Sequence, residues 1–301
     1  MTQELNQEAV ISIASKHLGK VGGEGYKDTY DPSLLVEIPR YLNREAYGIK
    51  EDNLPFVGGD VWNAYEVSAI TNKGLPVVGM LKIYYSADSK FHVESKSIKL
   101  YLNSFNMTKM GDTAEECINM LKERVAKDLS EKLQTEVLVE MFTETPEKEY
   151  TFENFSRIQN EVNLDNVHFT SYKSDENQLE KSGQSGVIKV EVDFLRSNCR
   201  VTNQPDFGNM FLHIEGKDLP TLESLAKYVV SHRQVSHFHE EIAEMTYMHL
   251  QKAFKLDKLM VACLYSRRGG IDINPVRASH LELIPKWFAD PKCKIEKTLK
   301  Q

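Results

Sequence analysis

The sequence predicts an α+β protein built from two tandem modules, each with an antiparallel sheet and two helices. The order strand, strand, helix, helix, strand occurs twice, first in residues 61–142 and again in residues 187–266. The strand predicted over residues 187–194 alternates apolar and polar residues, which is typical of antiparallel sheets with one buried face. Neither repeat alternates strands with helices, so a doubly wound parallel sheet is not expected.

In the first repeat, residues 61–70 and 75–85 are predicted to be strands joined by the turn residues TNKG. Helices are predicted over 97–106 and 113–129, and a closing strand over 135–142. The second helix begins with a capping box formed by Thr113 and Glu116. Its apolar stripe has i+4 spacing and consists of Cys117, Leu121, Val125 and Leu129. A short amphipathic helix is predicted ahead of this repeat, over residues 3–19.

The second repeat opens with the strictly alternating strand 187–194 and continues with a strand over 209–216. Helices are predicted over 219–232 and 237–254, followed by a strand over 258–266. Residues 144–182 are polar and rich in turn residues, which indicates a connection between modules. The predicted division is therefore 1–143, a linker over 144–182, and 183–301.

The composition of the 301 residues fits a folded protein, with 41% apolar and 27% charged residues. The net charge of −7 argues against a general surface for polyanions. No apolar run approaches the roughly 20 residues that span a bilayer, and the N-terminal sequence does not have the pattern of a signal peptide. The four scattered cysteines are expected to be free thiols, so we expect a cytoplasmic protein.

The stretch RSNCRVTNQPDFG contains the strongest candidate for a nucleophile. The alternation ends at Phe194, so Cys199 is expected just beyond a strand, where functional groups are often displayed. Arg196 and Arg200 flank it, and a nearby cation lowers the pKa of a thiol. The competing interpretation is a small, buried packing residue. Asp206 fits equally well as a turn residue after Pro or as a proton donor for the thiol.

The stretch HFHEE has two interpretations. Its two glutamates suit the positive end of a helix, and a serine before it can cap that helix. Alternatively, His232, His237 and His239 could bind zinc. No HExxH spacing is present, and the sulfur candidates Cys199 and Cys263 belong to separate predicted strands, so we do not expect a metal.

Two further stretches are candidates for binding an anion. VESKSIKLY places Glu94, Lys96 and Lys99 at a strand–helix junction, where lysines are disfavoured by the helix dipole unless an anion binds there. A solvated helix start is the simpler alternative. YSRRGGIDINP combines two arginines with two glycines, which allow a ligand to approach the backbone closely.

Taken together, ESKSIKLY, SNCRVTNQPD, FHEE and SRRGGIDINP closely resemble the motifs of the NADPH-dependent nitrile reductases of queuosine biosynthesis, the QueF family, in its long two-module form. The resemblance runs from about residue 35 to residue 285 in consistent order. It implies the tunnelling fold (T-fold), whose modules each pair an antiparallel sheet with two helices. Phe207 stands where many relatives have tryptophan, and it keeps an aromatic ring there.

The resemblance also implies a reaction. Cys199 would attack the nitrile carbon of 7-cyano-7-deazaguanine to give a covalent thioimide. Asp206 would protonate the nitrogen derived from the nitrile. Two successive NADPH molecules would then supply the hydrides that yield 7-aminomethyl-7-deazaguanine.

The same resemblance implies the binding residues. Those implied for the substrate are Val93, Glu94, Ser95, His239 and Glu240. Those implied for NADPH are Ser95, Lys96, Lys99, Arg267, Arg268 and Gly269. One catalytic site per chain is expected, with no metal, no direct contact with nucleic acid and no membrane association. A homodimer is expected, since long edge strands favour pairing.

Two other functions remain open at this point. One is a zinc-dependent, cyclohydrolase-like enzyme of the same broad fold that acts on a purine or a pterin. The other is a non-catalytic protein that binds a deazapurine or associates with tRNA, which the acidic balance of the chain disfavours.

Overall fold

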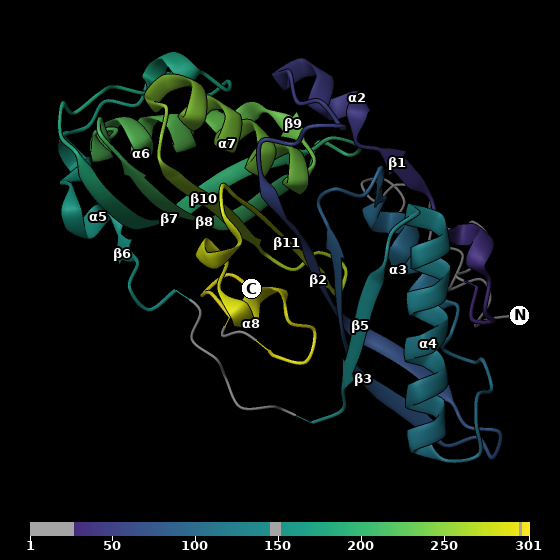
Figure 1. The fold of residues 1–301 in the computed structure, drawn as a ribbon. Coiled ribbons are helices and arrows are strands. Elements are labelled where there is room, and N and C mark those ends of the chain that lie inside the picture. The colour runs from purple at the N-terminus through teal and green to yellow at the C-terminus, as the bar shows by residue number, and fades with distance from the viewer. Residues whose placement is uncertain (1–26, 145–151, 295–296) are drawn as a thin grey trace, which may run out of the picture.

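The computed structural model describes residues 27–144, 152–294 and 297–301, and its centre is a nine-stranded sheet shared by both repeats (Figure 1). The first repeat contributes β2 (Val57–Ile70), β3 (Pro76–Ser86) and β5 (Val137–Phe142). The rest are β6 (Ser156–Arg157), β7 (Gly186–Cys199), β8 (Pro205–Gly216), β9 (Ser236–His237), β10 (Lys258–Tyr265) and β11 (Ile271–Ala278). Their order is β5-β3-β2-β11-β10-β8-β7-β6, and β9 pairs with β7. A separate two-stranded sheet pairs β1 (Glu37–Pro39) with β4 (Phe91–Val93).

Two long helices and two shorter ones pack on this sheet. They are α3 (Ser95–Asn103) and α4 (Ala114–Leu133) of the first repeat, and α6 (Leu222–Val230) and α7 (His239–Phe254) of the second. Short helical segments are α2 (Tyr41–Arg44), α5 (Ile158–Glu161) and α8 (Lys286–Ala289). Single 3₁₀ turns are η1 (Pro32–Leu34), η2 (Glu45–Tyr47), η3 (Leu164–Asn166), η4 (Glu176–Gln178), η5 (Ser231–Gln234) and η6 (Leu281–Leu283). No helix in the described ranges is long and apolar enough to cross a bilayer.

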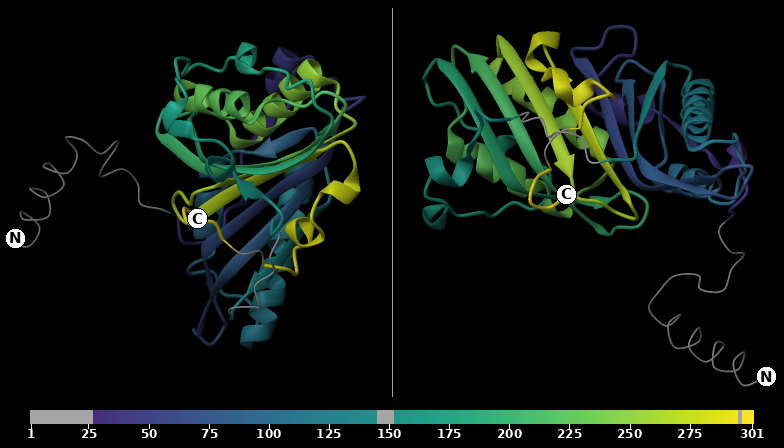
Figure 2. Two further views of the ribbon diagram at one scale, coloured as in Figure 1. Left: turned by 90° about the vertical axis from the view of Figure 1, so that its left-hand side faces the viewer. Right: turned by 90° about the horizontal axis from the view of Figure 1, so that it is seen from below.

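The α+β class and both repeats are confirmed. The capping box of Thr113 and Glu116 forms at the start of α4, and the predicted stripe from Cys117 to Leu129 is buried against the first repeat's strands. The predicted elements of both repeats occur in the predicted order, with the short strands β4 and β9 added, and the long strands of both run side by side in one twisted sheet (Figure 2). The helix expected over 3–19 lies outside the described residues.

The structure corrects the expected position of Cys199, which is the last residue of β7 rather than a loop residue beyond it. The pairing of β7 with β8 has a register shift between Val192 and Leu195, which interrupts the alternation of apolar and polar residues. The predicted strand therefore ended at Phe194. Such a bulge adds a residue to one strand, so the pattern breaks although the pairing continues. Asp206 likewise belongs to β8, so it is not a turn residue.

The strand β11 was not predicted separately from the glycine-rich stretch before it, and it joins the two repeats. It pairs with β10 on one side and with β2 on the other, from Ile271 opposite Ala64 to Ala278 opposite Val57. Its polar residues Asp272 and Asn274 are fully buried, which hides the alternation expected of a strand. The two repeats therefore share one hydrogen-bonded sheet.

The second part of the predicted linker is packed against the second repeat. The strand β6 pairs with β7 in parallel, and Ile158 in α5 is fully buried in the core of that repeat. The division into modules at 143 and 183 stays a prediction.

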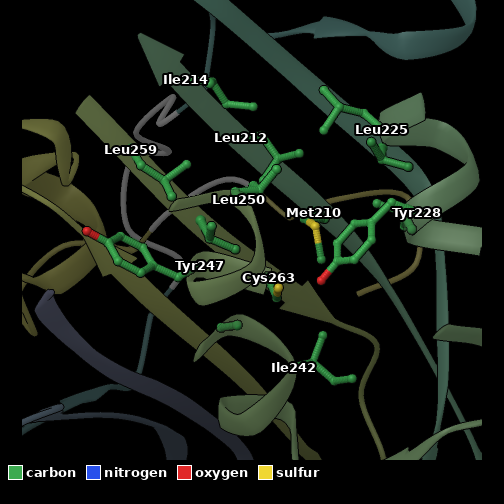
Figure 3. Close-up of a cluster of buried hydrophobic side chains, with 14 of the residues drawn as sticks. Met210, Leu212, Ile214, Leu225, Tyr228, Ile242, Tyr247, Leu250, Leu259 and Cys263 are labelled. Atoms are coloured by element: carbon green, nitrogen blue, oxygen red, sulfur yellow. The ribbon is translucent and has the colours of Figure 1, made fainter. Parts of the chain in front are cut away.

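Each repeat has its own apolar core between strands and helices. Figure 3 shows the core of the second repeat, where Met210 and Leu212 of β8 and Cys263 of β10 meet Tyr228 of α6 and Leu250 of α7. A second cluster lies between α3, α4 and the strands of the first repeat. A third, smaller cluster of alternate residues from the central strands packs against Phe288 of α8.

A buried network of charges ties the repeats together beside the β2–β11 pairing. Arg277 of β11 contacts Asp60 of β2 at 2.9 Å and Glu244 of α7 at 2.8 Å. Arg40 contacts Asp60 at 2.5 Å, and Arg44 contacts Glu244 at 2.8 Å. Burial raises the pKa of both carboxyls, but the arginines outweigh it and hold each pKa below its usual value. The two carboxylates therefore stay ionised and each binds groups from both repeats.

We predict that Glu244→Gln lowers the free energy of unfolding by about 3–5 kcal/mol, because removing one partner leaves buried guanidinium groups uncompensated. Chemical denaturation measures the change. The control is Glu223→Gln on α6. Glu223 forms a surface ion pair with Lys227, and loss of this pair should leave the denaturation midpoint close to that of the parent protein. A Glu244→Gln protein as stable as the control would contradict the assigned importance of the network.

Candidate active site

The candidate site is a pocket of about 220 Å³ at the boundary between the two repeats. The predicted site residues that line it are Val93, Ser95, Lys96, Lys99, Cys199, Asp206, His239, Glu240, Arg268 and Gly269. The first four come from β4 and α3 of the first repeat, and the others come from the second. Residues that the sequence placed more than a hundred positions apart therefore face one space.

The β7–β8 hairpin positions Cys199 and Asp206 on one face. Asp206 pairs across the strands with Ser197, and Cys199 follows two residues later, so all three side chains have the same orientation. The turn between them is closed by a bond of 2.8 Å from the Cys199 amide to the Gln204 carbonyl. Asn203 adopts a left-handed conformation with φ 55°. The tight hairpin explains how residues seven apart come together.

The thiol of Cys199 has a pKa below its usual value. Burial raises this pKa, but hydrogen bonds from the Thr202 side chain and from the backbone of Thr202 and Val201 outweigh that effect. The charge of Asp206 acts in the opposite sense. By contrast, burial raises the pKa of Cys117, and that of Cys263 to about 12. Cys199 is therefore the thiol of these three that is suited to react.

The arginines that flank Cys199 in the sequence are directed elsewhere, a point that the sequence left open. Arg196 donates to the carbonyl of Arg233, and Arg200 contacts Glu241 at 2.8 Å. The guanidinium that interacts with the sulfur is that of Arg268, which lines the same pocket: burial lowers the pKa of Arg268, and Asp206 and then Cys199 raise it. Sequence distance hid this contact, since Arg268 lies on the loop between β10 and β11.

Asp206 is a buried carboxylate with two basic partners. Arg268 donates to Oδ1, and Nε2 of His239 lies 3.3 Å from Oδ2. Burial raises the pKa of Asp206, but His239 and Arg268 outweigh it, so the pKa is below its usual value. The His239 ring stacks on Tyr265 at 3.7 Å, which fixes its orientation. In this state Asp206 is a base rather than an acid at neutral pH.

Glu240 offers acceptor atoms that the protein leaves unused. Its side chain is buried at the start of α7, and Oε1 has no hydrogen-bond partner within the described ranges. The nearest basic group is Nδ1 of His92, at 3.7 Å. The indole Nε1 of Trp62, another lining residue, is also buried without a partner there. Such groups are costly to bury unless a ligand pairs with them.

Glu94 and Arg267 are the predicted site residues that do not line the pocket. The Glu94 carboxylate caps α3, accepting from the amides of Lys96 at 3.0 Å and Ser97 at 2.8 Å. Arg267 lies over the Tyr65 ring at 3.7 Å and donates to the Gln301 carbonyl at 3.3 Å. Their roles in binding stay predictions.

One rim of the pocket suits an anionic ligand. Lys96 and Lys99 lie in the first turns of α3, and neither forms an ion pair with a described carboxylate. Gly269 has φ 59°, and a Cβ placed there would collide with Nζ of Lys99. The two lysines line the same pocket as Arg268 and the backbone of Gly269. This group of cations and backbone suits the phosphates of a nucleotide such as NADPH.

The sequence analysis missed several lining residues. They are Trp62, His92, Gln204, Phe238, Ser266, Ile271 and Ile273, and His237 was considered only as a zinc ligand. His237 pairs with Cys199 through β9, and its Nδ1 lies 2.9 Å from Glu241. Its place two residues before His239 was the available signal. Nothing in the sequence marked Trp62, because its position depends on the pairing of β2 with β11.

The residues considered for zinc do not converge. His232 is fully buried beside Tyr228 and does not line the pocket, and burial lowers its pKa to about 3. Cys263 lies in the apolar core. Among residues 27–144, 152–294 and 297–301, no three histidine, cysteine or carboxylate side chains are grouped to hold a metal ion. The expected absence of a metal is left to experiment.

The fold and pocket define a class, that of T-fold proteins with an activated cysteine beside a carboxylate. Residues 26–141 match the family described as "Nitrile reductase, 7-cyano-7-deazaguanine-reductase N-term", and residues 205–282 match "QueF-like protein". A relative from Colwellia psychrerythraea, an NADPH-dependent 7-cyano-7-deazaguanine reductase, is 36% identical over 285 residues, covering 93% of this chain and 97% of the relative. One of the same name from Rickettsia bellii is 38% identical over 273 residues, covering 89% and 94%. The chain belongs to this reductase family.

We predict that iodoacetamide at pH 7 alkylates Cys199 at least about tenfold faster than Cys117 or Cys263, because the thiolate is the reacting form. The relative rates are obtained from the cysteine-containing peptides by mass spectrometry of the native protein. Equal rates at the three positions would contradict the activation of Cys199.

Proposed function

We propose that the chain reduces the nitrile of 7-cyano-7-deazaguanine to the aminomethyl group of 7-aminomethyl-7-deazaguanine with two molecules of NADPH. The names of the relatives support the substrate and the cofactor. The observation that carries the proposal is the meeting of Cys199, Asp206 and a cationic rim in one pocket. A nucleophile, a proton-transferring group and a phosphate site are what this reaction requires.

The unused acceptors of the pocket suit the deazaguanine. Oε1 of Glu240 can accept from the N–H groups on the guanine-like edge, and a carboxylate bonds well to paired donors. Val93, Ser95 and His239 complete the proposed binding surface. We keep Glu94 in this role as a proposal that requires its carboxylate to leave the amides of α3.

The first chemical step joins Cys199 to the substrate. The sulfur bonds to the nitrile carbon, one π bond of C≡N breaks, and the nitrogen gains a proton to give a thioimide. Because Asp206 is a carboxylate in the free protein, the proton that it delivers is one that it first accepts from the Cys199 thiol. The step is a net addition with no leaving group.

The two reductions need hydride and proton. When bound, NADPH supplies hydride, and two molecules in succession supply the four electrons. Lys96, Lys99, Arg268 and Gly269 are proposed to hold the phosphates, with Ser95 beside them. Asp206 and the stacked His239 lie where they can pass one proton to nitrogen in each reduction. Sulfur leaves the carbon after the first reduction, which regenerates Cys199.

The wider context of the reaction is also proposed. The product fits queuosine biosynthesis, a pathway of tRNA modification, without direct contact between this chain and nucleic acid. A cytoplasmic location and a homodimer complete the proposal. The exposed edge of β5, which pairs only with β3 in the described sheet, is compatible with pairing between chains.

We predict that the parent protein oxidises two NADPH per nitrile consumed and that Cys199→Ala abolishes turnover. Absorbance of NADPH and chromatography of the product measure both. The matched control is Cys293→Ala, a partly exposed cysteine outside the pocket that should keep activity. Turnover by Cys199→Ala would overturn the mechanism.

Two other results would favour the alternative functions. Stoichiometric zinc and loss of activity with chelators would favour the cyclohydrolase-like enzyme. Binding of the nitrile without turnover would favour a non-catalytic protein.

We predict that Gly269→Ala raises the KM for NADPH about tenfold or more, because the added Cβ collides with Lys99 and the backbone has positive φ. Steady-state kinetics measures this change. The control is Gly183→Ala, which has a similar φ of 69° but no heavy atom within 4 Å of the added Cβ. An unchanged KM in Gly269→Ala would remove this backbone from the cofactor site.

A further inference from the structure

Arg268 is shared by the groups that the proposed reaction uses. Its guanidinium donates to Oδ1 of Asp206 and to the side-chain oxygen of Gln204, and it lines the pocket with Cys199, whose charge raises the pKa of Arg268. Its side chain is 32% exposed, so a ligand entering the pocket can reach it. One guanidinium therefore interacts with both the carboxylate of Asp206 and the sulfur of Cys199.

The other groups around Asp206 cannot replace this cation fully. His239 from α7 lies 3.3 Å away, Tyr265 from β10 stacks on that histidine, and Cys199 faces Asp206 from β7. Without Arg268, the carboxylate of Asp206 and the ionised form of Cys199 would repel each other in a pocket that is partly desolvated. Like charges held close together disfavour double ionisation, so one group would take up a proton.

A competing site for Arg268 lies on the same rim. Lys96 and Lys99 line the pocket, and Nζ of Lys99 lies over the backbone of Gly269, next to Arg268. Arg268 extends from a short loop with two glycines at positive φ, at positions 269 and 270. An anion held by the lysines therefore lies within reach of the guanidinium, and it competes with Asp206 for it.

We propose that Arg268 is a switch, which holds Asp206 as a carboxylate able to accept the proton of the Cys199 thiol in the free protein, and which releases Asp206 to take up a proton from solvent when a phosphate-bearing ligand binds the rim. This inference rests on the proposed function, since it orders the same steps. The free protein is set for attack by sulfur. The protein with a phosphate ligand is set for proton donation.

The proton balance is complete. After the phosphate ligand binds, Asp206 takes one proton from solvent, directly or through His239. It gives that proton to nitrogen as hydride from NADPH adds to carbon, and returns to the carboxylate. Each two-electron reduction thus consumes one hydride and one proton, and product release restores the contact between Arg268 and Asp206.

The test is the pH profile of Cys199 alkylation, read by peptide mass spectrometry with and without inorganic pyrophosphate at constant ionic strength. In the parent protein, pyrophosphate should slow alkylation about tenfold at pH 7, and the slowing should vanish at high pH, where the thiol is ionised regardless. In Arg268→Gln, alkylation of Cys199 should already be slow without pyrophosphate and should not respond to it. The rate in Arg268→Lys should lie between those of the parent protein and Arg268→Gln. The matched control Arg196→Gln, close to Cys199 in sequence but bonded to a backbone carbonyl, should behave as the parent.

Three results would overturn the switch. The first is a pH profile of Cys199 alkylation in Arg268→Gln that matches that of the parent protein. The second is slowing of alkylation by pyrophosphate at every pH, which would indicate steric blocking. The third is that pyrophosphate does not change the rate of alkylation in the parent protein. In Arg268→Gln, the acidic side of the pH profile of Cys199 alkylation should also show a second ionisation, that of Asp206. This ionisation should be absent from the double variant Asp206→Asn/Arg268→Gln. These readouts do not use turnover. NADPH consumption by the parent protein reports separately on the proposed function.

Discussion

The site depends on the junction where β11 pairs with β2, because the pocket has one wall from each repeat. Arg277 lies at this junction, and its guanidinium contacts Asp60 of the first repeat and Glu244 of the second. Main-chain pairing sets the register, while the charges fix the repeats at one angle, since a buried carboxylate cannot exchange its arginine for water. The two walls are held within reach of one ligand by these constraints.

On that frame, the chemistry follows from competition between burial and local partners. Burial alone would raise the pKa of both Cys199 and Asp206, as it does for the thiols of the cores. The Thr202 side chain and the hairpin amides reverse this effect for Cys199, and His239 and Arg268 reverse it for Asp206. An aspartate with a depressed pKa cannot bring its own proton, so any role in protonation requires that it first receives one. The need for a switch arises from this conflict.

Much of the fold and of the site could be predicted from the sequence because the signals are local. Capping, apolar stripes and turn residues predicted both repeats, and the family motifs predicted ten of the residues that line the pocket. The failures have non-local causes. The bulge in β7 interrupted the alternation ahead of Cys199, and buried polar residues concealed β11. The guanidinium beside the sulfur came from Arg268 rather than from Arg196 or Arg200, because sheet pairing, not sequence distance, decides which side chains meet.

The most direct test of the central claim is the intact mass of the protein after incubation with 7-cyano-7-deazaguanine in the absence of NADPH. The account predicts a gain equal to the full mass of the nitrile, since addition expels no group, with the adduct on Cys199 and its loss when NADPH is added. No adduct, or an adduct that persists in Cys199→Ala, would contradict covalent catalysis by this cysteine.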